Sequence, residues 1–179
     1  KCIQGDINIE NSSQLNHLLT NTKFKFAKEG GSTLVMDGVD ISAEITSAQV
    51  TDFVSYVSTI SAVREKLVQY QRDMAEGIDV VLEGRDIGTV VFPNAEYKFF
   101  LVADIHERAK RRKKEMDAKG EVVSLEELTS EMEERDRKDS TRRHSPLKKA
   151  EDAVEIDTTG ISIEEQVNRI VEIVNKTIK

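Results

Sequence analysis

The sequence predicts an α/β protein in which a parallel sheet packs against helices and a small β lobe is inserted in the first half of the chain. Three observations lead to this prediction. Strands and helices alternate from residue 97 onward, which is typical of a parallel sheet. The continuous apolar run at residues 80–82 indicates a further strand, buried on both faces. Apolar and polar residues alternate between residues 22 and 42, as they do in antiparallel strands.

The first 22 residues are interpreted as the end of a helix followed by a polar connection. Within it, Leu15, Leu18 and Leu19 form a short apolar stripe, which we assign to the core. Two antiparallel strands are then expected, with Phe24 at the start of the first and Leu34 at the start of the second. Their connections are glycine-rich turns, which the sequence places at residues 29–32 and 37–38.

Residues 47–74 have helical periodicity, and a break near residues 59–61 divides them into two helices. After the run at residues 80–82, the next strand is expected at residues 97–103. Asp104 then has the position of a helix N-cap, and the cation-rich helix that it opens should stop at Gly120.

A second capping pattern, at Ser124 and Glu127, predicts a helix that ends at about Arg137. Residues 154–156 supply a third strand. The last helix is expected to be capped by Ser162 and Glu165, because a regular apolar stripe with helical spacing follows them.

Length and composition exclude several classes of function. The 179 residues suit one domain with a sizeable core, and no apolar run approaches the ~20 residues that span a bilayer. A net charge of −7 argues against a general nucleic-acid binder. One cysteine and three scattered histidines make no metal-ligand pattern, so no metal site is predicted within the chain. We expect a cytoplasmic monomer that contacts neither membranes nor nucleic acid.

The residues after the run at 80–82 are the first candidate site. Glu83, Gly84, Arg85 and Asp86 follow the expected strand, and ligands bind at the carboxyl ends of strands in open α/β sheets. The guanidinium of Arg85 suits a phosphate, and the carboxylate of Asp86 can accept from an exocyclic amine or a hydroxyl. A salt-bridged turn explains these residues equally well at this stage.

Arginines recur near the ends of the expected elements. One exposed arginine is usually part of a surface salt bridge. Several that converge on one cleft would instead serve phosphoryl transfer, where catalysis is mostly positioning and charge stabilisation. The arginines concerned are Arg64, Arg85, Arg108, Arg111, Arg112, Arg135, Arg142 and Arg143.

Four motifs in the correct order resemble those of bacterial cytidylate kinases. They are residues 55–64 (Ser-Tyr-Val-Ser-Thr-Ile-Ser-Ala-Val-Arg), 84–93 (Gly-Arg-Asp-Ile-Gly-Thr-Val-Val-Phe-Pro), 107–112 (Glu-Arg-Ala-Lys-Arg-Arg) and 134–142 (Glu-Arg-Asp-x-x-Asp-x-x-Arg). The resemblance covers essentially the whole chain, and the second motif is highly specific to the family. It implies the fold of the P-loop nucleoside monophosphate kinases.

The resemblance also implies how the single kinase domain, residues 1–179, is organised. The core would comprise residues 1–19, 65–107 and 144–179. Residues 20–64 would form a CMP-binding lobe that contains the small β structure, and residues 108–143 a mobile helical lid.

Roles for individual residues follow from the same resemblance. The positions that match cytosine recognition are Ser55, Arg64 and Asp86. Arg85 and Arg142 match positions that bind the CMP phosphate. Arg135 and Asp139 match positions that contact the ribose. Lid positions that would reach the ATP phosphates are Arg108 and Arg112. The residues expected to be catalytic are Arg85, Arg135 and Arg142.

The sequence departs from the family pattern at two places. Glu83 stands where an aspartate is more usual, a tolerable exchange. The phosphate-binding loop Gly-x-x-x-x-Gly-Lys-[Ser/Thr] and the Asp-[Ser/Thr]-Gly-x-x-Tyr-Arg segment are missing. We therefore interpret the sequence, which starts at Lys1, as a partial record of a complete kinase whose P-loop segment precedes it.

The resulting hypothesis is a cytidylate kinase that transfers the γ-phosphate of ATP, with Mg²⁺, to CMP or dCMP and gives CDP or dCDP. The alternative is a catalytically silent fragment that binds CMP without turnover. A third reading, nucleic-acid binding through the basic residues 108–114, is disfavoured by the acidic total and by the acids interleaved at Glu107 and Glu115.

Overall fold

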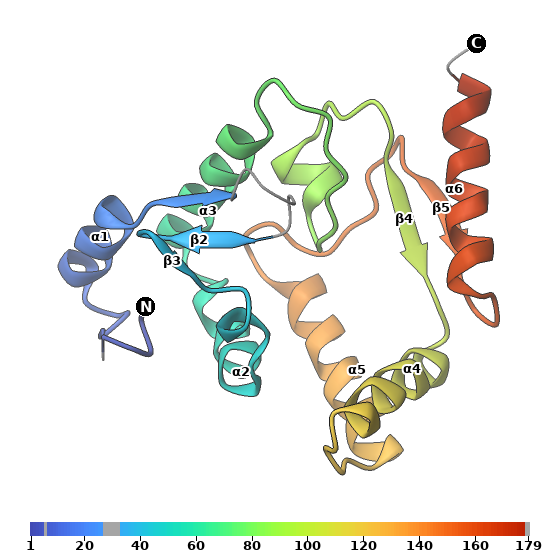
Figure 1. The fold of residues 1–179 in the computed structure, drawn as a ribbon, viewed down its shortest axis with the longest axis horizontal. Coiled ribbons are helices and arrows are strands. Elements are labelled where there is room, and N and C mark those ends of the chain that lie inside the picture. The colour runs from blue at the N-terminus through green and yellow to red at the C-terminus, as the bar shows by residue number, and fades with distance from the viewer. Residues whose placement is uncertain (6, 27–32, 178–179) are drawn as a thin grey trace. The chain divides into compact units, whose positions relative to one another are not determined.

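The computed structural model describes residues 1–5, 7–26 and 33–177 (Figure 1). The chain divides into two compact units, Lys1–Val81 and Leu82–Lys179. Within the described ranges, no helix combines the length and the apolar character that crossing a bilayer requires.

The first unit begins with turns and helix α1 (Ser12–Asn21). Asn11 caps this helix, since its side chain accepts hydrogen bonds from the backbone N–H groups of Ser13 (3.1 Å) and Gln14 (3.2 Å). The interpretation of this segment as a helix end and a polar connection is therefore wrong. The core assignment is confirmed for Leu15, which is buried.

A small antiparallel sheet follows, in the order β1 (Phe24–Phe26), β2 (Leu34–Met36) and β3 (Val39–Asp40). The antiparallel pairing is confirmed, but the described residues form three strands rather than two. The two-residue turn at Asp37 (φ 51°) and Gly38 (φ 88°) is the reason, because positive φ at both positions closes a tight hairpin. The turn predicted at residues 29–32 lies outside the described residues.

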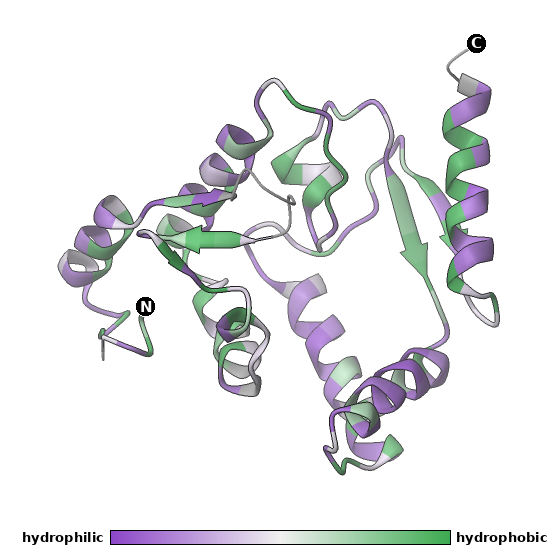
Figure 2. Ribbon diagram, in the orientation of Figure 1, coloured by the Kyte–Doolittle hydropathy of each residue, from purple (hydrophilic) through white to green (hydrophobic). Residues whose placement is uncertain are grey.

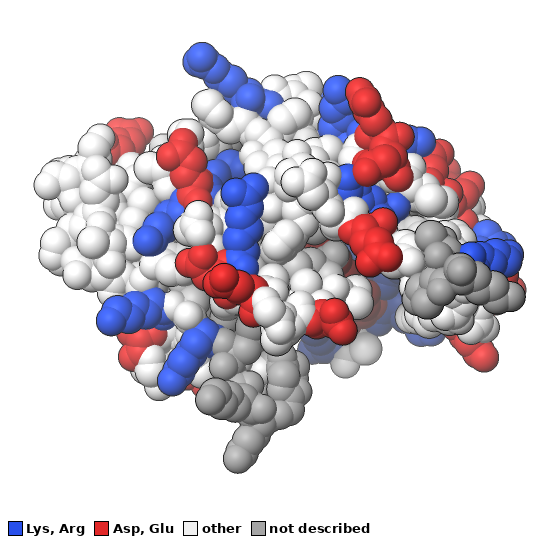
Figure 3. Space-filling view, turned by 90° about the horizontal axis from the view of Figure 1, so that it is seen from above, with Lys and Arg blue, Asp and Glu red and all other residues white. Residues whose placement is uncertain are grey.

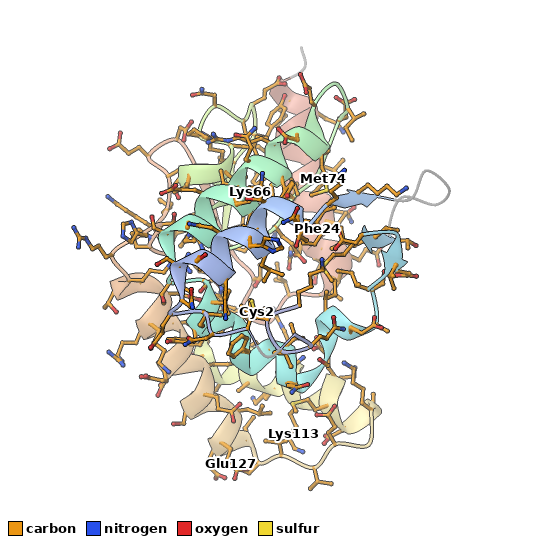
Figure 4. All side chains as sticks on the ribbon, turned by 90° about the vertical axis from the view of Figure 1, so that its left-hand side faces the viewer. Cys2, Phe24, Lys66, Met74, Lys113 and Glu127 are labelled. Atoms are coloured by element: carbon orange, nitrogen blue, oxygen red, sulfur yellow. The ribbon has the colours of Figure 1, made fainter. Side chains whose placement is uncertain are left out.

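Helices α2 (Ala48–Val57) and α3 (Ser61–Ala75) confirm the predicted pair and its break; a short 3₁₀ turn, η1 (Glu44–Thr46), precedes them. Tyr70 ties α3 to the small sheet. Its hydroxyl donates to the carbonyl of Thr22, and its ring meets that of Phe24 edge-on at 5.2 Å. Figure 4 shows Phe24, Lys66 and Met74 in this part of the unit, and the ammonium of Lys66 lies 4.8 Å from the centre of the Tyr70 ring.

The second unit contains a parallel pair of strands, β4 (Phe99–Val102) and β5 (Val154–Asp157), in register from Phe99 opposite Val154. The predicted parallel pairing is thus confirmed. Figure 2 shows the apolar character of β4 beside the hydrophilic helices α4 (Ile105–Ala118) and α5 (Leu125–Thr141).

The three predicted helix starts in this unit are confirmed, and so is the predicted stop at Gly120. Asp104 caps α4, and Gly120 (φ 79°) follows its end. Ser124 and Glu127 form a reciprocal capping box at the start of α5, which extends beyond the predicted Arg137 to Thr141. Ser162 and Glu165 exchange the same pair of bonds at the start of α6 (Ile163–Thr177).

Helices α4 and α5 form a hairpin. The ammonium of Lys113 on α4 pairs with Asp117 (2.8 Å) and donates to the carbonyl of Val123 (3.3 Å) in the connection. Figure 4 shows Lys113 and Glu127 together at this end of the hairpin. The hairpin therefore presents the opposite end of α5 to the segment that contains Arg85, with which it shares the contacts described below.

The strand predicted at residues 80–82 is not formed. Val81 is fully exposed (101%), and these residues have no ladder with another strand among those described. A strand needs a hydrogen-bonded neighbour, and the apolar run alone does not supply one. The chain forms a single π-helical turn, η2 (Ile87–Val91), a little further on, and Val91 is buried there.

Candidate functional site

The first part of the site is the segment that leads into the π-helical turn. The backbone carbonyl of Asp86 accepts from the N–H groups of Val90 (2.9 Å) and Val91 (3.2 Å), which anchors this residue at the start of the turn. Turns of this kind occur frequently at functional sites. Asp86 is itself 8% exposed, so its carboxylate lies largely away from water.

One face of α5 supplies the second part. Arg135 and Asp139 are four residues apart on α5, which places them on the same side of the helix, and Arg142 is the residue that follows its last turn. The side chain of Asp139 is 12% exposed and meets three cations. Its carboxylate lies 3.3 Å from Arg85 Nε, 3.3 Å from Arg142 Nη1 and 4.0 Å from Arg135 Nε.

Arg142 joins the two parts. Its side chain is 9% exposed; Nη2 lies 4.0 Å from a carboxylate oxygen of Asp86, and Nε donates to the carbonyl of Ser145 (2.6 Å). Ser145 adopts a positive φ of 51° in the bend after α5. The bend thus turns a backbone acceptor toward the guanidinium, which holds Arg142 between Asp139 and Asp86.

Asp136 extends the site to α4. One of its carboxylate oxygens lies 3.3 Å from Arg85 Nη1, and the other lies 2.6 Å from Arg108 Nη2. Sequence reasoning did not single out Asp136, although it belongs to the motif at residues 134–142. Its spacing of three residues from Asp139 on a helix was the signal that could have found it.

The Arg/Asp cluster, as we call this group, brings together most of the predicted site residues. Its members are Arg85, Asp86, Arg108, Arg135, Asp136, Asp139 and Arg142. The cluster contains four guanidinium groups and three carboxylates, so its net charge is +1. It can attract an anion and also offer acceptors to the hydroxyl or amine groups of the same ligand.

Three further predicted residues are Arg112, on α4, and Arg64 and Ser55, in the first unit. Arg112 Nη1 pairs with Glu115 on its own helix (3.2 Å), outside the cluster. Arg64 is half-buried in the first turn of α3, in the first unit. Ser55 lies in α2, and its side chain is outside the described ones.

Charges outside the cluster are mixed. Lys and Arg side chains are interspersed with Asp and Glu on the face shown in Figure 3. On α5, hydrogen bonds from Arg137 and, secondarily, Lys138 lower the pKa of Glu134 to about 2. This exposed trio contrasts with the cluster, because water screens its ion pairs.

A metal site built by protein ligands alone is not found in the described ranges, where no three His, Cys, Asp or Glu side chains gather suitably. The Arg/Asp cluster itself offers guanidinium donors and carboxylate acceptors to a ligand. An α/β protein whose helix pair gathers guanidinium groups in this way has the donors that a phosphorylated ligand needs.

Comparison with known proteins makes the assignment specific. The family profile described as Cytidylate kinase matches residues 1–176. The chain belongs to the cytidylate kinase family, which confirms the resemblance seen in the four motifs and, with it, the expected fold class.

Three relatives illustrate the match. The cytidylate kinase of Pediococcus pentosaceus is 45% identical over 180 residues, which cover 100% of this chain and 80% of the relative. That of a Geobacillus species is 48% identical over 177 residues, 98% of this chain and 79% of the relative. The cytidylate kinase of Desulforamulus reducens is 48% identical over 176 residues, which cover 98% of this chain and 79% of the relative.

Proposed function

We propose that this protein is a cytidylate kinase, which transfers the γ-phosphoryl group of ATP to CMP or dCMP and gives CDP or dCDP. The observation that carries the proposal is the family match along residues 1–176, which includes every residue of the Arg/Asp cluster. The comparisons do not support the alternative of a silent CMP-binding fragment, since the relatives that match the chain are named as kinases.

Arg85 and Arg142 are proposed to bind the CMP phosphate. Support comes from their place on either side of Asp139, with each guanidinium 3.3 Å from that carboxylate. A planar guanidinium can donate two parallel hydrogen bonds to a phosphate, which fixes the orientation of the acceptor as well as its position. Positioning of this kind is the main contribution of a protein to phosphoryl transfer.

Asp86 is proposed to accept from the exocyclic amine of cytosine, together with Ser55 and Arg64 at the ring carbonyl and nitrogen. Uracil has a carbonyl in place of that amine, so a carboxylate there repels it and leaves a polar group unpaired. Asp139 and Arg135 are proposed to contact the ribose hydroxyls. We keep residues 20–64 as the proposed CMP-binding lobe and residues 108–143 as the proposed lid.

In the proposed reaction, an oxygen of the CMP phosphate forms a bond to the γ-phosphorus while the bond to the β–γ bridging oxygen breaks, and ADP leaves. Arg85, Arg135 and Arg142 would offset the charge spread over the transferred group. Arg108 is the proposed contact to the ATP phosphates from α4, with Arg112 as a second. The Nε of Arg108 is buried and has no hydrogen-bond partner among the described residues, so this atom can still donate a hydrogen bond.

Mg²⁺ is proposed to accompany ATP. This ion is usually held by one or two carboxylates, waters and the substrate phosphates, so a three-ligand protein cage is not needed.

A coupled assay of ADP formation tests the proposal. Purified protein with ATP and Mg²⁺ should turn over CMP and dCMP, and UMP far more slowly. Asp86→Ala should reduce the preference for CMP over UMP, and Arg85→Met should lower both CMP affinity and turnover. Folded wild-type protein that forms no ADP in response to CMP or dCMP would refute the proposed activity.

A further inference from the structure

Asp136 occupies a singular position in the Arg/Asp cluster, because its two carboxylate oxygens face two arginines from different parts of the second unit. Oδ1 accepts from Arg85, which precedes the π-helical turn, at 3.3 Å. Oδ2 lies 2.6 Å from Arg108, which belongs to the first turn of α4. The side chain of Asp136 is 27% exposed, so water screens these contacts only in part.

The two arginines depend on Asp136 to different degrees. Arg85 is also held through its Nε by Asp139, at 3.3 Å. Arg108 pairs with Asp136 alone among the residues that the structure describes, and its buried Nε has no hydrogen-bond partner there. Loss of the Asp136 carboxylate would remove the ion pair of Arg108 described here. Arg85 would keep one of its two ion pairs, the one with Asp139.

Two guanidinium groups that share one carboxylate would repel each other without it. The geometry points to Asp136 as a positioning residue for phosphoryl transfer, which holds Arg85 and Arg108 at a set separation. This inference rests on the proposed function, in which Arg85 binds the acceptor phosphate and Arg108 the donor phosphates. Asp136 acts through both arginines and touches neither substrate.

A carboxylate is needed for this task. Asparagine keeps the shape of the side chain but has one acceptor oxygen, and its amide NH₂ would face a guanidinium, donor against donor. Glutamate keeps the charge but moves it by one methylene. Asp136→Asn should therefore disturb the arrangement more than Asp136→Glu does.

The test compares Asp136→Asn with Glu134→Gln, which is a matched control on the same helix. Glu134 also faces two cations, Arg137 (2.7 Å) and Lys138 (3.3 Å), but outside the cluster. For Asp136→Asn we expect kcat for CMP to fall about 10- to 100-fold, the value of a charge-assisted hydrogen bond, and to fall by a larger factor than KM rises. Glu134→Gln should keep wild-type kinetics, and Asp136→Glu should recover part of the loss.

Two further readouts separate positioning from folding. Titration calorimetry should show weaker binding of CMP to Asp136→Asn and unchanged binding of cytidine, which lacks the phosphate. Arg108→Met should lower kcat in the wild type but have little further effect in Asp136→Asn, because the two residues act as a unit.

The outcomes separate this inference from the function on which it rests. Wild-type protein without CMP turnover would overturn the function. Active wild-type protein with equal kinetics for Asp136→Asn and Glu134→Gln would overturn the role of Asp136 alone. Equal loss of CMP and cytidine binding in Asp136→Asn, or strict additivity with Arg108→Met, would show a merely structural residue and also overturn it.

Discussion

Asp139 should stabilise the unliganded protein because it neutralises a nearly buried cation. We predict that Asp139→Asn lowers the free energy of unfolding by about 2–4 kcal/mol. The bond to Arg142 should contribute most of this, since both side chains are about nine-tenths buried. The contact with Arg85, whose side chain is 34% exposed, should add less, and the 4.0 Å contact with the half-exposed Arg135 very little.

Urea unfolding followed by far-UV circular dichroism measures the change, with Glu134→Gln as the control at an exposed site. The control should lose far less stability, because water screens the ion pairs of an exposed side chain. Inorganic phosphate should raise the unfolding midpoint of Asp139→Asn more than that of the wild type, because an anion replaces the lost charge. A loss for Asp139→Asn equal to that of Glu134→Gln would refute the reasoning about burial.

Three other predictions concern local features. Ser124→Ala removes the capping box of α5 and should cost about 1 kcal/mol of stability. Gly38→Ala should cost about 1–2 kcal/mol through backbone strain alone, since φ is +88° and no residue beyond its two chain neighbours lies within 4 Å of the added carbon. Because the pKa of Glu134 is lowered from 4.5 to about 2, its pairs should stabilise fully above about pH 4.5 and be lost toward pH 2, a pH dependence that Glu134→Gln should reduce.

Thermal unfolding and acid titration check these predictions. Ser124→Thr should retain most of the stability that Ser124→Ala loses, and Gly38→Asn, which tolerates positive φ, should lose less than Gly38→Ala. Equal melting temperatures for the alanine and the conservative variant would contradict the cap or the strain argument. An acid profile of Glu134→Gln that follows the wild type between pH 4.5 and 2 would contradict the third prediction.

Local signals predicted much of the fold. The helix starts at Asp104, Ser124 and Ser162 could be placed because an N-cap side chain and the first turn are neighbours in sequence. The interpretation of the first 22 residues overlooked Asn11, an N-cap of the same kind. The strand expected at residues 80–82 failed for a different reason, since burial and pairing both depend on distant residues.

The candidate site shows the same division. The motifs supplied Arg85, Asp86, Arg135, Asp139 and Arg142, which the structure brings into one cluster. They did not distinguish Arg108 from Arg112, because both lie on one basic helix. The packing of α4 against α5 does so, as it brings Arg108 to Asp136 while Arg112 pairs with Glu115.

The sequence by itself thus determined the family of this protein, the kinds of side chain available for a phosphorylated ligand and most of the helix ends, all of which depend on residue identity and short spacing. Only the tertiary structure decided which guanidinium groups share a carboxylate, and it alone brought Asp136 into the site. Ion pairs form between atoms a few ångströms apart, and segments as distant in sequence as Arg85 and Asp136 meet only after the chain has folded.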